Sequence, residues 1–198
     1  MLKSTALWAP ATLLFLFTHA SQAQTGPDDA PRAEVALSND TVQLRYLTNG
    51  EAVNLDRGIA AAGMLLTEDR DLVFDGAVLF PIDLNLRALT VLVGPRAYAA
   101  LLDEENSDVM TVALGTEIRL DLDRQRGLAL VGHAYYGPDI LTFGSADNLT
   151  DLGARLEIGL ASKLTAFGGM RWLEFDLTEG QGERTLQEEL FAGISWRF

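Results

Sequence analysis

A two-residue alternation of apolar and polar side chains runs through most of this 198-residue chain and limits its fold more than any other feature. Between residues 108 and 122, the even positions are almost all apolar: Met110, Val112, Leu114, Thr116, Ile118, Leu120 and Leu122. The odd positions are small, polar or charged: Thr111, Ala113, Gly115, Glu117, Arg119 and Asp121. Successive side chains of a β-strand point to opposite faces, so this period predicts strands with one apolar face.

The same period predicts about ten strands along the chain. They are expected at residues 32–38, 41–48, 57–67, 71–80, 88–102, 108–122, 127–137, 150–161, 164–177 and 184–198. Most of them reach the about 9 to 11 residues with which a tilted strand crosses a membrane. The first two strands are short, and a hairpin or a bulge is expected between them at residues 38–40.

The balance of apolar and charged residues points to a membrane barrel. After residue 23 no apolar run approaches the about 18 residues of a membrane helix, which excludes a helical membrane protein. Yet 48% of the chain is hydrophobic, although its net charge is −13. A barrel reconciles these facts, because its lipid-facing residues occupy every second position. We therefore expect residues 32–198 to form an all-β, transmembrane antiparallel β-barrel. The alternative is a soluble lipocalin-like barrel with apolar residues inside.

Residues 1–23 have the pattern of a cleavable signal peptide, which implies export. Lys3 supplies a positive start, residues 6–18 are mostly apolar, and residues 21–23 (Ser-Gln-Ala) form a small-x-small cleavage site. Residues 24–31 contain Gly and Pro and are expected to form a short linker. The chain has no Cys, so neither a lipoprotein anchor nor a disulfide is expected.

The last predicted strand has an apolar face that ends on an aromatic residue. This face carries Leu190, Ala192, Ile194, Trp196 and Phe198. It resembles the C-terminal signature by which outer-membrane barrels are recognised for insertion. The resemblance implies a protein of the bacterial outer membrane that contacts lipid and lipopolysaccharide and is delivered by the barrel assembly machinery.

The alternation places twelve charged strand residues on the face opposite to the lipid. They are Arg32, Glu34, Arg45, Arg96, Glu117, Arg119, Asp121, Arg155, Glu157, Arg171, Glu189 and Arg197. An Arg facing lipid at mid-membrane depth would cost about 2–4 kcal/mol, so these side chains are expected in the lumen. Because the signs nearly balance, we expect ion pairs across a narrow interior and not a wide channel. If the barrel conducts, Arg96, Arg119, Arg155, Arg171 and Glu117 would line its narrow part.

His133 is the one His after residue 23, and it shares the lumen-facing side of its strand with Tyr135. We expect both to be polar lumen residues. The alternative is an outer-membrane enzyme that acts on lipid or peptide around His133, because barrel hydrolases use a His beside a Ser or an Asp. No Ser lies two residues beyond His133, and no spacing of acidic residues would hold a catalytic water. The expectation is therefore a non-enzymatic protein with a structural or small-solute permeation role.

The acidic residues of the loops suggest no specific ligand. No Asp-x-Asp-x-Asp-Gly loop is present, and the acidic run at 103–105 is typical of a solvated loop tip, so we expect no metal and no cofactor. The negative net charge argues against nucleic acid as a partner. A role in surface binding or adhesion would use the loop at 139–149. The oligomeric state has no signature in the sequence.

Two segments suggest a family. Residues 133–144 read His-Ala-Tyr-Tyr-Gly-Pro-Asp-Ile-Leu-Thr-Phe-Gly, and residues 168–172 read Gly-Gly-Met-Arg-Trp. They resemble the YfaZ family of small outer-membrane proteins, in which a Tyr-Tyr-x-Pro-Asp turn follows the central strand and a Gly-Tyr-Arg-like segment lies in the next hairpin. The likeness is best over residues 72–198, and Met170 stands where an aromatic residue is usual. It implies an outer-membrane barrel and leaves the activity open.

Overall fold

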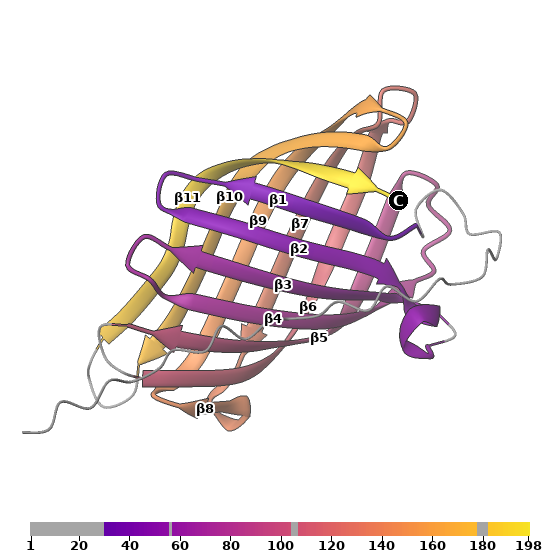
Figure 1. Ribbon diagram of the computed structural model, residues 1–198. Coiled ribbons are helices and arrows are strands. Elements are labelled where there is room, and N and C mark those ends of the chain that lie inside the picture. Colours follow the sequence, from indigo (N-terminus) through magenta and orange to yellow (C-terminus); the bar gives the residue numbers. More distant parts are fainter. Residues whose placement is uncertain (1–29, 56, 104–106, 178–181) are drawn as a thin grey trace, which may run out of the picture.

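Ten long strands form one antiparallel sheet that closes on itself (Figure 1). The computed structural model describes residues 30–198 except 56, 104–106 and 178–181. β1 (Arg32–Leu37) pairs with β2 (Thr41–Asn49) on one side and with β11 (Gly182–Arg197) on the other, and this pairing closes the barrel. The predicted all-β antiparallel barrel of about ten strands is therefore confirmed. The predicted signal peptide and most of the linker lie outside the described residues.

The other long strands follow each other around the barrel in chain order. They are β3 (Ile59–Thr67), β4 (Leu72–Ile82), β5 (Leu89–Leu102), β6 (Ser107–Asp123), β7 (Leu128–Gly137), β9 (Ala146–Ala161) and β10 (Leu164–Leu177). Each begins and ends within a few residues of its predicted bounds. The turn at residues 38–40 is a hairpin, closed by a hydrogen bond from the backbone N–H of Ser38 to the carbonyl of Thr41 (3.0 Å).

Three short elements in the described part of the chain were not predicted. They are the 3-10 turns η1 (Gly50–Val53) and η2 (Asp139–Leu141) and the strand β8 (Thr142–Gly144). β8 pairs with β6 beyond the last residue that pairs β6 with β7, so it continues the path of β7 after an interruption. The interruption lies at Pro138, which has no N–H for the sheet.

The two ends of the barrel carry different turns. We call the end at which Phe198 lies the C-terminal rim; it also carries the turns at residues 50–58, 124–127 and 162–163 (Figure 1). The opposite rim carries the turns at residues 38–40 and 68–71 and the segment 138–145.

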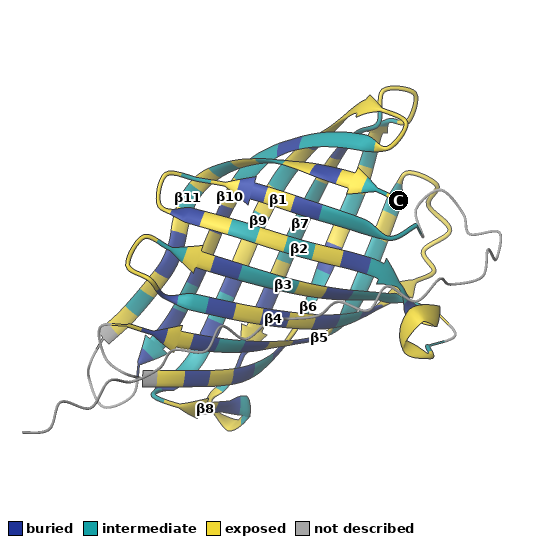
Figure 2. Cartoon of the chain, viewed as in Figure 1, coloured by how far each residue is buried: buried dark blue, intermediate teal, exposed yellow. Residues whose placement is uncertain are grey.

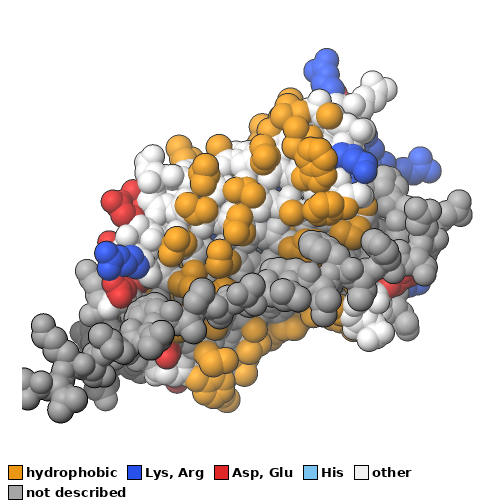
Figure 3. Space-filling model, in the orientation of Figure 1, with side chains coloured by type: hydrophobic (Ala, Val, Ile, Leu, Met, Phe, Trp, Pro, Cys, Tyr) orange, Lys and Arg blue, Asp and Glu red, His pale blue; other side chains and the backbone are white. Residues whose placement is uncertain are grey.

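The outer surface of the barrel is apolar. Buried and exposed residues alternate along the strands (Figure 2), and on the face shown in Figure 3 hydrophobic side chains lie along the middle of the barrel while charged ones lie at the two ends. Leu190 is 78% exposed and Phe198 is 60% exposed. Soluble monomers rarely expose apolar patches beyond a few hundred Å², whereas a barrel in lipid requires them. Among the described residues, no helix is long and apolar enough to cross a membrane.

A hydrophobic core fills the lumen toward the opposite rim. It includes Leu65, Val73, Leu102, Val109, Leu149, Leu173, Phe175, Leu177 and Leu186. This core was not predicted from the sequence. The alternation was used to place only the charged residues in the lumen. A barrel of about ten strands leaves a lumen that side chains of any kind can fill.

A β-bulge in β11 contributes to this core. The pairing of β10 with β11 shifts by one residue, because Leu173 lies opposite Gln187 and Glu174 lies opposite Thr185. The extra residue, Leu186, is buried, and so is its neighbour Gln187. A bulge lets two successive side chains turn to the same face, which simple alternation does not predict.

Candidate functional site

An ion-pair network fills the lumen between the hydrophobic core and the C-terminal rim. Among the described residues it has six arginines: Arg32, Arg45, Arg96, Arg119, Arg155 and Arg171. It has six carboxylates: Glu34, Asp75, Glu117, Asp121, Asp151 and Glu157. The two sets of formal charges cancel, which lets a narrow interior hold so many ions.

Asp151 is the centre of the part nearest the core, and it is fully buried (0% exposed). Arg171 donates to both carboxylate oxygens at 2.8 Å, in the two-pronged geometry that an arginine fork favours. Tyr98 donates its hydroxyl to Oδ2 at 2.7 Å, and Arg96 donates to the same oxygen at 3.4 Å. The Nε2 atom of His133 lies 3.1 Å from Oδ1. Four side chains from three strands, β5, β7 and β10, therefore converge on one carboxylate.

Arg96 connects this centre to a second carboxylate. Its Nε donates to Asp75 at 2.9 Å, and its guanidinium lies 5.2 Å from the ring centroids of both Tyr98 and Tyr135. Such cation–π contacts stabilise a buried guanidinium by about 2 kcal/mol when it is desolvated. Two carboxylates and two aromatic rings therefore hold the guanidinium of Arg96 in place.

A second cluster lies nearer the C-terminal rim. Arg155 donates to both oxygens of Glu34 at 2.8 and 3.0 Å, and its Nη2 lies 2.7 Å from Glu157. Its guanidinium also lies 4.6 Å from the ring centroid of Phe167. Arg119 joins Glu157 to Asp121, with its Nε 3.0 Å from Asp121.

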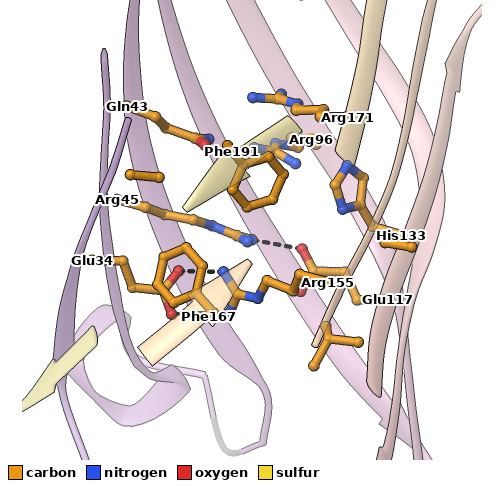
Figure 4. Close-up of a pocket in the computed structure, with 13 residues that line it drawn as sticks. Glu34, Gln43, Arg45, Arg96, Glu117, His133, Arg155, Phe167, Arg171 and Phe191 are labelled. Carbon is orange, nitrogen blue, oxygen red and sulfur yellow. Dashed lines mark hydrogen bonds and ion pairs between the residues drawn. The ribbon is translucent and has the colours of Figure 1, made fainter. Parts of the chain in front are cut away.

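Glu117 forms a third cluster between these two. Arg45 donates to its Oε1 at 2.5 Å, and the hydroxyl of Tyr135 donates to the same oxygen at 3.1 Å. Figure 4 shows that the guanidinium groups of Arg45 and Arg155 reach from opposite sides toward the glutamates Glu34 and Glu117. The three clusters together span the lumen.

Glycines on neighbouring strands make room for the rings of this network. A Cβ atom on Gly153 would lie 2.3 Å from Cε1 of His133. A Cβ atom on Gly115 would lie 2.2 Å from the carbonyl oxygen of Ala134 and 2.4 Å from the ring of Tyr135. Both positions face into the lumen, so only a residue without a side chain lets the rings lie across the adjacent strand.

Most of the charged residues that were expected in the lumen belong to the ion-pair network, but two of them lie outside it. Glu189 lies at the opposite rim, where the backbone N–H of Asp40 approaches it at 3.4 Å. Arg197 is partly exposed at the C-terminal rim, and no ion pair found in the described part of the chain includes it. His133 and Tyr135, which we expected to be polar lumen residues, contact Asp151 and Glu117 respectively.

Three members of the network were not singled out from the sequence: Asp75, Tyr98 and Asp151. Asp75 interrupts an otherwise apolar predicted strand, and this was a signal that it faces inward. Asp151 is the second residue of the strand predicted at 150–161, so its position within a strand was uncertain. β9 begins five residues before it, at Ala146. Tyr98 carries no charge, so it was not among the charged residues that the alternation placed in the lumen.

Three hollows adjoin the network and the core. A central cavity of about 30 Å³ is lined by Arg45, Arg155, Arg171 and the glutamates Glu34 and Glu117. A vestibule of about 190 Å³ at the C-terminal rim is lined by residues that include Arg32 and Arg119.

The third hollow, of about 360 Å³ at the opposite rim, is acidic. Its lining includes Asp40, Glu68, Asp69, Asp71, Glu188 and Glu189. On the same side of the barrel, carboxylate oxygens of Glu174, Asp176 and Glu183 lie within 4.8 Å of one another. Exposed acidic groups of this kind are common without an ion, and this group is separate from the lumen.

Two solved outer-membrane proteins have similar architecture. A bacterial polysaccharide outer membrane secretin superposes with a TM-score of 0.50 at 14% identity, covering 80% of this chain and 56% of that chain. A KdgM porin in complex with disordered oligogalacturonate gives a TM-score of 0.44 at 7% identity, covering 85% and 99%. The chain thus spans little more than half the length of the secretin. At this low identity the likeness to the secretin concerns the barrel fold alone.

The family comparison covers the whole barrel. No curated protein matches the chain. The model of the YfaZ precursor family matches residues 33–198, from the first strand to the last residue. The resemblance noted in the two sequence segments is confirmed, and the chain belongs to the YfaZ precursor family.

Proposed function

We propose that this protein is a non-enzymatic, structural barrel of the bacterial outer membrane whose lumen is closed to solutes in its resting state. The observation that carries the proposal is the filling of the lumen along its length. A charge-balanced ion-pair network occupies the part toward the C-terminal rim, and a hydrophobic core occupies the part toward the opposite rim.

Several features support the outer membrane as the location. The outer surface presents an apolar belt, and Trp196 and Phe198 lie exposed on it at the C-terminal rim. Aromatic residues at this level suit the interface between hydrocarbon and head groups. We expect the belt to contact lipid and lipopolysaccharide, and we expect β11 to be the strand that the barrel assembly machinery engages.

The filled lumen opposes spontaneous permeation. An ion that passes the layer of Leu149, Leu173 and Phe175 would lose its water without gaining a polar partner. An ion that passes the network would have to separate buried ion pairs, and removing one partner of such a pair costs about 3–5 kcal/mol. A resting barrel with both barriers in place is closed.

The surroundings of His133 give little support to the enzyme alternative. His133 does pair with Asp151, but Arg96 and Arg171 already bind that carboxylate. No Ser, Thr or Cys lines the central cavity beside His133, and about 30 Å³ of space does not admit a lipid or a peptide. The absence of a hydroxyl or thiol nucleophile in this lining and the small space both support the non-enzymatic proposal.

A second candidate, gated permeation of small solutes, is favoured by the vestibule at the C-terminal rim. Its about 190 Å³ opens into the lumen and is lined by Arg32, Arg119 and Arg155. A small anion that entered it would stand at the C-terminal side of the ion-pair network. Passage would then require the hydrophobic core to move.

Planar-bilayer recording with purified, refolded protein separates the two candidates. We expect no conductance steps from the wild-type barrel, while a conducting porin in the same bilayers serves as the positive control. We expect steps from a variant whose core is emptied at three positions, Leu149→Gly, Leu173→Gly and Phe175→Gly. Steps from the wild-type protein would overturn the closed barrel and support gated permeation.

The enzyme alternative is tested in cells. We expect identical lipid A profiles and outer-membrane peptide patterns from cells that lack the protein, contain it, or contain the His133→Gln variant. A profile that changes with the wild-type protein and reverts with His133→Gln would establish an activity and overturn the non-enzymatic proposal.

A further inference from the structure

We infer that the central cavity binds a small inorganic anion of about the size of chloride, which enters from the C-terminal rim. This inference concerns a site within the barrel and holds whether or not the barrel conducts. It rests on unpaired donors, on the charge of the lining, and on the size and access of the cavity.

Three buried donors on residues that line the cavity have no partner within the part of the chain that the structure describes. They are Nε of Arg45, Nε of Arg155 and Nη1 of Arg171. All three residues line the cavity, and Arg171 is only 3% exposed. A buried donor that lacks an acceptor costs about 1–3 kcal/mol, and more when it is charged. Three such donors around one small space indicate an acceptor in that space.

The charge of the lining favours an acceptor that is itself negative. Arg45, Arg96, Arg155 and Arg171 line the cavity together with only two carboxylates, Glu34 and Glu117. Asp75 and Asp151, which compensate Arg96 and Arg171 elsewhere, do not line it. The lining itself therefore carries four guanidinium groups and two carboxylates, and although the charges of the whole network cancel, this local surplus of N–H donors favours an anion, which accepts charge-assisted hydrogen bonds.

The volume limits the occupant to a small one. About 30 Å³ accommodates one monatomic anion or one or two water molecules, because a single water needs about 10–15 Å³ on this measure. The rings of Phe167 and Phe191 also line the cavity (Figure 4), as does Ala36, so a larger oxyanion has no room.

The vestibule provides the route of entry. It shares Glu117, Val131 and Arg155 with the central cavity, so these residues form the boundary between the two spaces. Arg32 and Arg119 stand at the vestibule wall, where cationic groups raise the local concentration of anions. An anion thus reaches the cavity from the C-terminal rim without crossing the hydrophobic core.

Thermal unfolding of the refolded full barrel in detergent tests the inference. Sodium chloride, sodium bromide and sodium gluconate are compared at one ionic strength, with gluconate as an anion too large for the cavity. We expect the unfolding temperature to rise by a few degrees with chloride or bromide and to saturate, as mass action requires for a ligand of the folded state. The same unfolding temperature in all three salts would overturn the inference.

Variants locate the effect. Ala36→Leu fills the cavity and should abolish the difference between halide and gluconate. Arg45→Lys keeps the charge beside Glu117 but removes the unpaired Nε donor, so the halide concentration for half-maximal stabilisation should rise several-fold. Arg126→Lys, the matched control at an exposed rim position (side chain 81% exposed), should leave it unchanged. A full halide effect in the Ala36→Leu protein would place the anion elsewhere.

Crystallography in bromide identifies the occupant directly. We expect an anomalous bromine peak within hydrogen-bond distance of the guanidinium groups of Arg45, Arg155 and Arg171. Ordinary density without anomalous signal at this position would mean that the cavity holds water only, and the inference would fail.

Discussion

At the scale of single residues, Asp151 has the greatest influence on the lumen. It is fully buried and receives hydrogen bonds from Arg171, Arg96 and Tyr98, and it contacts His133. Its charge is the counterion for guanidinium groups that have no access to bulk water. Such a residue is needed less for its own contacts than for the cations that it neutralises.

Asp151→Asn tests this role. The amide keeps the shape of the carboxylate but removes its charge, so Arg96 and Arg171 stay buried with one counterion fewer. We expect a loss of about 3–5 kcal/mol in the free energy of unfolding. Urea titration of the refolded barrel in lipid vesicles, followed by tryptophan fluorescence, measures it. Asp139→Asn, at an exposed position of η2, should change the free energy by less than about 0.5 kcal/mol.

Gly115 gives a second prediction at this scale. Gly115→Ala places a methyl group against the carbonyl of Ala134 and the ring of Tyr135, so the strands must separate or the ring must leave Glu117. We expect a loss of about 1–3 kcal/mol in the same urea titration. Gly132→Ala is the control, because the nearest atom to its Cβ lies at an ordinary 3.6 Å. Equal stability of the two variants would show that the ring does not need this space.

At the scale of elements, β11 has two functions in the fold. It closes the barrel by pairing with β1 and β10, and its outward face carries the aromatic residues of the C-terminal rim. The alternation in its last residues made this face predictable. The bulge at Leu186 was not predictable, because it depends on how β10 and β11 align across their loop.

Phe198→Ala tests β11 as the strand that guides insertion. If the assembly machinery reads this residue, the variant should be severalfold less abundant in the outer membrane, as measured by fractionation and immunoblotting. Leu122→Ala is the matched control, since Leu122 is also an exposed apolar residue at the C-terminal rim (53% exposed). If both variants reach the membrane in wild-type amounts, the terminal residue is not a signal.

At the scale of the whole molecule, the barrel has two unlike rims, and we expect the C-terminal rim to face the periplasm. Because the chain has no native Cys, single cysteines report the orientation. Ile140→Cys, at a position 82% exposed beyond the opposite rim, should be labelled by a membrane-impermeant maleimide on intact cells. Ser162→Cys, in the β9–β10 turn, should be labelled only after lysis. The reverse pattern would invert the topology.

The sequence by itself determined the long strands, about ten in number, and the face of most of their residues. Those properties are local, because neighbouring residues on a strand must point to opposite sides. It therefore placed Arg45, Glu117, Arg155 and Arg171 inside. Only the tertiary structure decided which charges meet, because Arg155 binds Glu34 at a sequence separation of 121 residues and Arg45 binds Glu117 at a separation of 72. The hydrophobic core and the cavity likewise arise only when closure sets the register of all strands at once, and no period within one strand contains that information.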